Sequence, residues 1–213
     1  MKRVALVVVL AVAAVTPAAA QWLGMPVWNS PKGGTGITIS GDYAKPNADW
    51  GKGSAFGARG TVGLGSLSIT AGYASWNPAG PGSNFNSLGG NAAFRVIGGT
   101  LLPVNVNLLV GGARASVSGG SDLTNLVAGG GASISLPTPG VSIEPYVSLT
   151  NRWLKVSGVS GTNSNFGWTV GANLGFGLLG VHIAYDSQKL TGGGTGGVLG
   201  IGAHLALKAP LGM

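Results

Sequence analysis

Residues 166–178 read Phe-Gly-Trp-Thr-Val-Gly-Ala-Asn-Leu-Gly-Phe-Gly-Leu, and this stretch decides the fold. Every even position carries an apolar side chain, and every odd position is glycine or a small polar residue. A β-strand points successive side chains to opposite faces, so this segment has one apolar face and one small, polar face. It is longer than a typical globular strand and long enough to cross a bilayer when tilted. It therefore predicts a membrane-spanning strand.

The same alternation recurs along the chain and predicts about ten strands. They cover residues 34–43, 55–64, 67–76, 88–97, 104–114, 125–136, 141–153, 166–178, 180–187 and 198–208. The sixth is the least regular, because its middle is Gly129-Gly130-Gly131. Eight strands are the alternative, if the first or the sixth segment is not a strand.

The connections between these segments alternate in length. Short connections fall at residues 65–66, 98–103, 137–140 and 179–180, and longer ones rich in Gly, Asn, Ser and Pro fall at 44–54, 77–87, 115–124, 154–165 and 188–197. Short turns at one end and long loops at the other are typical of bacterial transmembrane barrels, in which the short turns are periplasmic. The pattern predicts an all-β chain with a single antiparallel up-and-down transmembrane β-barrel domain over residues 34–213.

The start of the chain predicts export. Lys2 and Arg3 form a positive start, residues 4–15 a short apolar core, and residues 17–20 (Pro-Ala-Ala-Ala) a small-residue cleavage site. The apolar core is too short for a membrane-anchoring helix. We therefore expect a cleaved signal peptide at residues 1–20, followed by a short periplasmic N-terminal segment at residues 21–33.

The composition is unusual for a soluble globular protein: the chain has 41 glycines, 8% charged residues and 45% hydrophobic residues. Because cysteine is absent, the chain can form neither a disulfide nor a thiolate site. The formal net charge is +7, but the basic residues are scattered rather than gathered in a stripe. We therefore expect no nucleic-acid partner.

Aromatic residues near the long loops predict a girdle at the level of the lipid headgroups. Amphipathic rings favour that level of a membrane. The girdle is predicted to comprise Tyr43, Phe56, Tyr73, Trp76, Trp153, Phe166, Trp168 and Tyr185.

Charged residues on the small-residue faces predict a hydrogen-bonded network inside the barrel. Buried charges require such partners. The expected members are Arg59, Arg95, Glu144, Arg152, His182, Asp186, His204 and Lys208. The strands that carry His182 and His204 should pair, which brings the two rings within a diagonal step of each other. A metal site there is the weaker alternative, and we expect no catalytic, cofactor-binding or metal site.

Many glycines share the inward-facing parity, among them Gly57, Gly167, Gly171, Gly200 and Gly202. Such small residues leave room in the lumen for water or a slim solute, or they permit strong coiling and a narrow cross-section. Because the expected lumenal cations outnumber Glu144 and Asp186, any pore should prefer small anions.

On these patterns, nearly all of residues 34–213 resembles the small outer-membrane β-barrel proteins of Gram-negative bacteria, the broad class of the OmpA, OmpX and OmpW barrels. The resemblance implies a monomer in the cell outer membrane that contacts lipid, lipopolysaccharide and the barrel-assembly machinery. It also implies a non-enzymatic protein, with a structural or surface role or a narrow, porin-like channel for small solutes. The alternative is a soluble secreted β-barrel or β-sandwich binding protein.

Overall fold

A computed structural model of the chain describes residues 22–80, 84–99, 102–117 and 120–207. The predicted signal peptide at residues 1–20 lies outside these ranges. No helix in the described ranges is long and apolar enough to cross a membrane. Eleven strands occur in them: β1 (Gly34–Pro46), β2 (Ser54–Gly65), β3 (Leu67–Asn77), β4 (Phe85–Ile97), β5 (Val104–Val117), β6 (Leu123–Ile134), β7 (Leu136–Thr138), β8 (Val141–Val156), β9 (Asn163–Phe176), β10 (Leu179–Lys189) and β11 (Thr195–Leu207).

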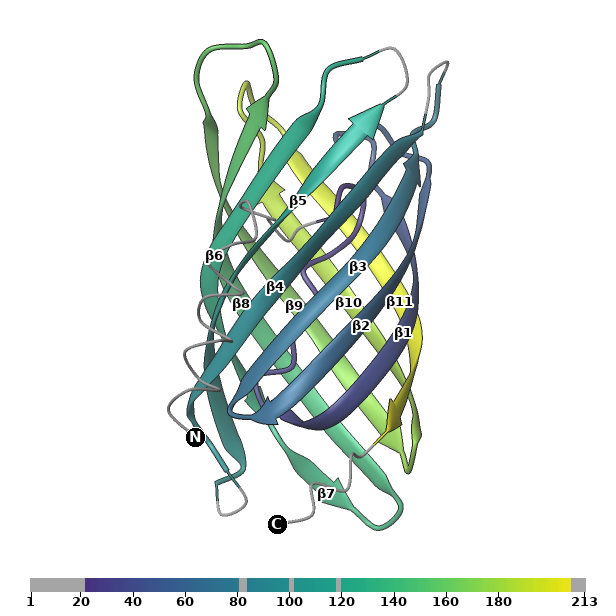
Figure 1. The fold of residues 1–213 in the computed structure, drawn as a ribbon, viewed down its shortest axis with the longest axis vertical. Helices are drawn as coiled ribbons and strands as arrows, with labels where there is room; N and C mark the ends of the chain where they lie inside the picture. Colours follow the sequence, from purple (N-terminus) through teal and green to yellow (C-terminus); the bar gives the residue numbers. More distant parts are fainter. Residues whose placement is uncertain (1–21, 81–83, 100–101, 118–119, 208–213) are drawn as a thin grey trace, which may run out of the picture.

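Ten of these strands close into one antiparallel barrel (Figure 1). Each pairs with its neighbours in sequence, and β1 pairs with β11 to complete the wall, with Ile39 opposite Leu205. β6 pairs directly with β8, while the three-residue β7 only extends a hairpin with the start of β8. The predicted ten-stranded barrel is therefore confirmed, including the glycine-rich sixth strand, and the alternative of eight strands is wrong.

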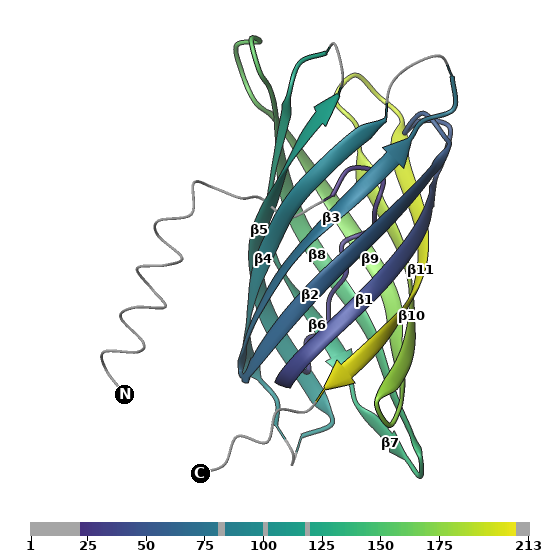
Figure 2. The same ribbon diagram turned by 45° about the vertical axis from the view of Figure 1, so that its right-hand side comes forward.

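The connections alternate between the two ends of the barrel, as predicted. β2 and β3 are separated by Ser66 alone, and β9 and β10 by residues 177–178. Gly177 has a φ of +68°, a left-handed conformation that suits glycine in such a tight turn. Longer loops at residues 47–53, 157–162 and 190–194 gather at the opposite end (Figure 2). We call these the short-turn end and the long-loop end.

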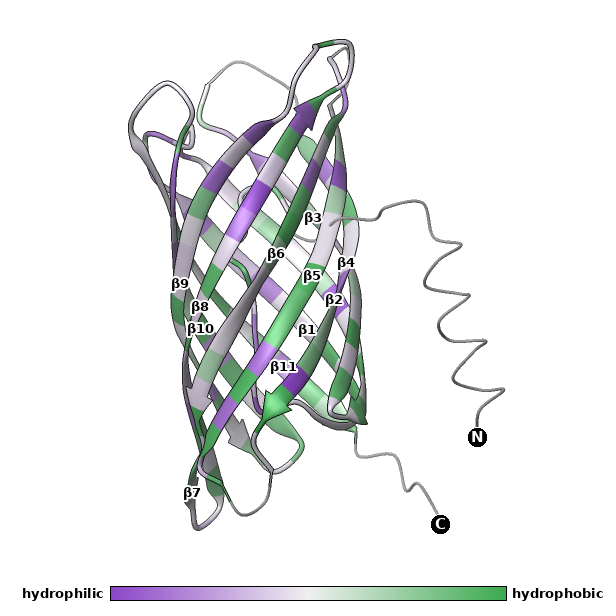
Figure 3. Cartoon of the chain, turned by 90° about the vertical axis from the view of Figure 1, so that its left-hand side faces the viewer, coloured by the Kyte–Doolittle hydropathy of each residue, from purple (hydrophilic) through white to green (hydrophobic). Residues whose placement is uncertain are grey.

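The outer surface of the barrel is apolar along most of its height. Figure 3 shows hydrophobic residues alternating with polar and small ones along the strands. The apolar member of each alternation faces outward, so large hydrophobic side chains are 40–70% exposed all around the wall. Examples are Ile39, Phe56, Leu88, Leu108, Leu149, Val170, Ile183 and Ile201. A soluble protein rarely exposes a continuous apolar surface of this extent, whereas a barrel in lipid requires one.

The inside of the barrel contains the N-terminal segment. Residues 22–33 run along the lumen from the long-loop end to the start of β1, with tight turns at residues 22–25 and 30–33 (Figures 1 and 2). Trp22, Met25 and Val27 are at most 4% exposed there. The segment predicted to be periplasmic therefore lies inside the barrel over residues 22–33, which we call the plug. Its large apolar side chains would face water outside, and burial stabilises them by about 25 cal/mol per Å² of apolar surface.

Candidate functional site

The plug closes the long-loop end of the lumen through apolar contacts. Trp22, Leu23 and Met25 pack in one buried cluster with Trp76 and with small inward residues of the wall. Those wall residues are Ala44, Ala55, Ala74, Ala113, Ala115 and Val198. The Trp22 indole N–H also donates to the Gly72 carbonyl at 2.9 Å. Small side chains on the wall thus leave space that the bulky plug residues fill.

Trp76 belongs to this interior cluster, so its predicted place in the outer aromatic girdle is wrong. Trp76 is 7% exposed, stacks on Phe85 with ring centroids 5.1 Å apart, and meets Trp50 edge to face. The reason is the parity of β3: Tyr73 and the other odd positions face outward, so position 76 faces inward. Gly24 has a φ of +75° and approaches the Trp76 ring so closely that a Cβ would overlap it.

The other predicted girdle residues lie on strand positions of the outward parity. Tyr43 and Phe56 contact each other with centroids 4.9 Å apart, and Trp168 and Tyr185 do so at 5.7 Å. The Tyr73 hydroxyl donates to Asn86 on the neighbouring strand at 2.8 Å. Trp153 and Phe166 complete the set. These rings stand on strand halves nearer the long-loop end.

A fully buried ion pair joins β8 and β10 over the inner face of β9. Arg152 and Asp186, 2% and 0% exposed, form two parallel hydrogen bonds of 2.7 Å. Thr169 donates to the same carboxylate at 2.6 Å, and the plug adds the Val27 backbone N–H at 3.3 Å. The guanidinium also donates to Thr150 and Gln188. Every partner that a buried charge needs is therefore present, and one of them comes from the plug.

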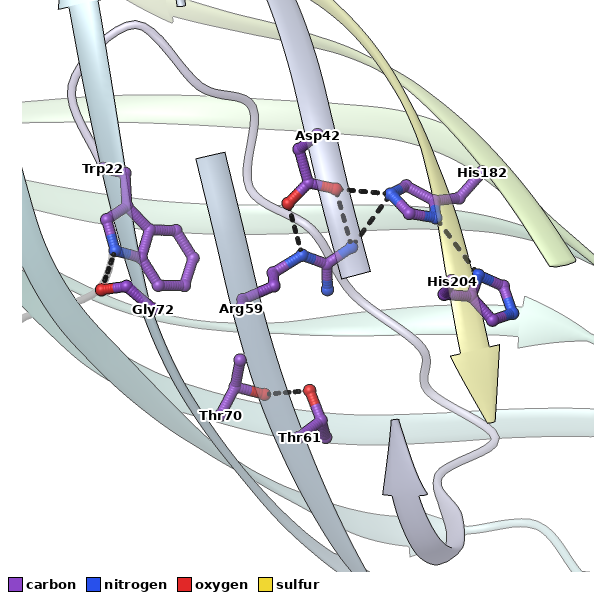
Figure 4. Close-up of polar contacts among 8 residues, drawn as sticks. All are labelled: Trp22, Asp42, Arg59, Thr61, Thr70, Gly72, His182 and His204. Carbon is purple, nitrogen blue, oxygen red and sulfur yellow. Dashed lines mark hydrogen bonds and ion pairs between the residues drawn. The ribbon is translucent and has the colours of Figure 1, made fainter. Parts of the chain in front are cut away.

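A second network joins β1, β2, β10 and β11 (Figure 4). Asp42 accepts from the Arg59 Nε at 2.8 Å and lies 2.6 Å from the His182 Nε2. The His182 and His204 Nδ1 atoms are 3.2 Å apart, with the rings nearly parallel. The tautomer that satisfies both contacts places a proton on Nε2 of His182 for Asp42 and one on Nδ1 of His204 for His182.

The plug binds this second network through Trp28. The Trp28 ring meets His182 edge to face, with centroids 4.6 Å apart, and lies 5.2 Å beneath the Arg59 guanidinium. A cation over an indole face is an attractive arrangement. Sequence reasoning missed Asp42 as a lumenal residue, although the outward parity of Ile39 and Tyr43 on the same strand indicates it.

Asn29 and Glu144 hold the part of the plug nearer the short-turn end. Asn29 and Asn107 exchange two amide hydrogen bonds of 3.1 and 2.8 Å, and Asn29 also donates to Ser148 at 2.9 Å. The Glu144 carboxylate accepts four hydrogen bonds, two from the plug and two from the wall. The donors are the Ser30 hydroxyl, the Lys32 backbone N–H, the Ser133 hydroxyl and the Asn173 amide.

The two remaining lumenal residues that the sequence predicts stand apart from these networks. Arg95 donates to the Lys32 carbonyl near the short-turn end, and Lys208 lies outside the described residues. With Asp42 inside, the described lumenal side chains of the wall carry three cations (Arg59, Arg95, Arg152) and three anions (Asp42, Glu144, Asp186). The excess of positive charge on which the predicted anion preference rests is therefore absent from the described wall.

Inward glycines make room for the plug and for the large polar side chains. A Cβ at Gly200 would come within 2.7 Å of Pro26, and one at Gly131 within 2.3 Å of Asn29. Gly167 and Gly202 are similarly covered by Arg152 and His182. The predicted space above these glycines is thus real, but chain atoms occupy it.

A cavity of about 390 Å³ lies in the lumen, on the short-turn side of Trp28 and beside plug residues 29–33. Its lining includes Trp28, Lys32, Arg59, Thr61, Thr70, Glu144, His182 and His204. It also reaches Thr35 and Leu207, which lie at the short-turn ends of β1 and β11. Among the described residues, no group of three or more histidine or acidic side chains is placed to hold a metal ion.

Replacing Asn29 with leucine is expected to destabilise the folded barrel by about 1–3 kcal/mol. The substitution leaves the buried Asn107 amide without its partner, and unpaired buried polar groups cost roughly this much. Reversible urea unfolding of the refolded protein measures the change. Asn163→Leu, at an exposed position at the start of β9, is the control and should change the free energy of unfolding by less than about 0.5 kcal/mol. Equal losses in both variants would contradict the anchoring role of Asn29.

No family model and no curated protein matches the chain. Among solved structures, Neisserial surface protein A is 12% identical, with 80% of this chain and 96% of that chain covered and a TM-score of 0.39. The β domain of the Bordetella autotransporter BrkA is also 12% identical. The match covers 82% of this chain and 100% of that chain, with a TM-score of 0.45. The N-terminal β-barrel domain of Pseudomonas aeruginosa OprF is 12% identical. That match covers 81% of this chain and 99% of that chain, with a TM-score of 0.35. These neighbours are outer-membrane β-barrels. At TM-scores below 0.5, the fold assignment rests on the closed hydrogen-bonded wall of this chain itself.

Proposed function

We propose that this chain is a non-enzymatic outer-membrane β-barrel that its own N-terminal segment keeps closed. Its role is structural or at the cell surface, and it does not form a permanently open channel. The single observation that carries the proposal is the plug: residues 22–33 fill the lumen of a barrel whose outer surface is apolar.

The exterior supports the membrane location. Large hydrophobic side chains face outward from every strand of the wall, which favours lipid contact over the alternative of a soluble secreted binding protein. Outer-membrane lipid and lipopolysaccharide are then the surrounding partners, and the barrel-assembly machinery inserts the chain. Because the wall closes on itself, it has no unpaired strand edge that would require a second copy, which fits a monomer.

The interior supports a closed, non-enzymatic barrel. The charged side chains of the two lumenal networks pair with one another: Arg152 with Asp186, and Arg59 and His182 with Asp42. Catalytic groups are instead expected to converge on a place where a reacting atom can sit. The polar side chains of this lumen hold the plug.

Membrane association is expected in cell fractionation, and the folded chain should migrate differently on gels before and after boiling. Closed barrels resist detergent until heated, because their hydrogen-bonded wall has no edge from which to unfold. A chain that stays in the supernatant after membranes are pelleted would contradict the membrane location and favour the soluble binding protein.

Planar-bilayer recordings test the closed lumen. The refolded chain is expected to show little or no steady conductance, whereas Gly200→Leu should open frequently, because the new side chain occupies the place of Pro26 and Trp28. Gly60→Leu is the matched control: position 60 lies on the outward parity of β2 with nothing within 4 Å of a Cβ. Heat-modifiable migration verifies that each variant has folded. Steady conductance of the unaltered chain would contradict closure by the plug.

A further inference from the structure

We infer that the lumenal cavity is a binding site for a small solute that carries one oxyanion group, a phosphate or a carboxylate. This goes beyond the proposed function, because a closed barrel needs no ligand. The cavity volume of about 390 Å³ lies in the range of small-molecule sites. The chemistry of the lining identifies the ligand class.

Arg59 supplies the main recognition group. Two of its guanidinium nitrogens, Nε and Nη2, contact Asp42 and His182. The third, Nη1, makes no hydrogen bond to the described residues, and Figure 4 shows it directed away from Asp42, toward the side where Thr61 and Thr70 lie. Asp42 and the Trp28 ring hold the guanidinium in place. A fixed guanidinium N–H is a strong and geometrically specific donor to phosphate or carboxylate.

Further polar groups line the same cavity. In the tautomer given above, Nε2 of His204 carries no proton, so it can accept a hydrogen bond from a hydroxyl group of the solute, and the ring lies over Gly180, where a side chain would displace it. Lys32 also lines the cavity, and its side chain forms no ion pair with the described residues. Thr61 and Thr70 add hydroxyl groups, which hydrogen-bond each other at 2.9 Å. These groups suit the oxygen atoms of an oxyanion and of neighbouring hydroxyl groups.

The charge balance around the cavity favours an anion. Lys32 and Arg59 are the basic residues of the lining and Glu144 is its acidic residue, whereas Asp42 and Arg95 are not part of the lining. Asp42 is paired with Arg59, and the four donors described above occupy the Glu144 carboxylate. The lining therefore holds two basic residues against one acidic residue, whose carboxylate is already hydrogen-bonded. The lining reaches the short-turn end, so under the proposed function the solute would enter from the periplasm.

Calorimetric titration of the refolded full chain in a non-ionic detergent tests the site. Glycerol 3-phosphate is the probe, and glycerol is the matched neutral compound. We expect saturable one-site binding of glycerol 3-phosphate and none of glycerol. Arg59→Lys keeps a positive charge opposite Asp42 but removes the free Nη1, and it should weaken binding by about tenfold or more.

Two further variants separate the site from general electrostatics. Lys32→Gln should weaken binding several-fold, whereas Lys155→Gln, at an exposed outward position of β8, should leave it unchanged. Heat-modifiable migration of each variant establishes that the barrel has formed, so a failure to bind is distinguishable from a failure of the proposed fold and location. Absence of saturable binding, equal binding of glycerol, or binding that Arg59→Lys and Lys32→Gln leave unchanged would each overturn the inference.

Discussion

Replacing Asp186 with alanine is expected to destabilise the barrel by about 3–5 kcal/mol. The substitution leaves Arg152, 2% exposed, as a buried cation without its carboxylate, and removing one partner of a buried ion pair costs roughly this much. It also removes the acceptor for Thr169 and for the Val27 backbone of the plug. Reversible urea unfolding of the refolded protein measures the loss.

Two control variants test whether burial of the ion pair causes this loss of stability. Asp122→Ala breaks an exposed ion pair with Arg114 in the long-loop region, and it should change the free energy of unfolding by less than about 1 kcal/mol. The double variant Arg152→Met, Asp186→Leu removes both charges together and should recover much of the stability that Asp186→Ala loses. If Asp186→Ala and Asp122→Ala cost the same, the described lumen does not bury its ion pair.

Ile183→Arg is expected to cost about 2–4 kcal/mol in a lipid bilayer. Position 183 lies midway along β10 on the outward face, is 45% exposed in the protein alone and stands opposite Ile201. An arginine on the lipid face near the bilayer midplane costs roughly this much. Unfolding titrations in vesicles measure the change.

Thr195→Arg is the control for depth. Thr195 lies on the same face at the long-loop end of β11, where its side chain is exposed. A charge near the interface should cost only about 0–1 kcal/mol. Equal costs at positions 183 and 195, or a larger cost at 195, would mean that the apolar wall does not sit in a membrane.

The wall of the barrel is predictable from sequence because its signal is local and repeated. Alternation such as Phe166, Trp168 and Val170 against Gly167 and Thr169 depends only on the two faces of a strand. A lipid exterior forces that alternation on every strand. The strand boundaries agree within about three residues, even where Gly129-Gly130-Gly131 weakens the pattern.

The plug was not predictable in the same way. Residues 22–33 carry no periodicity, since a segment inside a barrel contacts the wall on all sides. Two features do indicate it: large apolar residues at 22–28 with no expected strand to bury them, and inward glycines such as Gly200 that leave a lumen unfilled. Neither feature indicates that these apolar residues fill that lumen, because Pro26 and Gly200, which meet there, are 174 residues apart in the sequence (200 − 26).

Strand parity and register account for several contacts of the lumenal residues. His182 and His204 meet because a diagonal pairing follows from the register of β10 and β11. Strand parity also turns Asp42 and Trp76 inward. The predicted lumenal network does not include Asp42, and the predicted girdle includes Trp76. All four hydrogen-bond donors to Glu144 come from outside its own strand, and the alternation within a strand cannot predict such partners.

Spin labels on the outer face test the central claim, that this wall spans a membrane, most directly. The chain has no cysteine, so single cysteines at positions 149, 170 and 183 can carry labels without background. In vesicles, oxygen dissolved in lipid should relax all three labels more strongly than a water-soluble nickel chelate does. A label at position 195 should show the reverse. Greater accessibility of the three wall positions to the nickel chelate would contradict a membrane-spanning barrel.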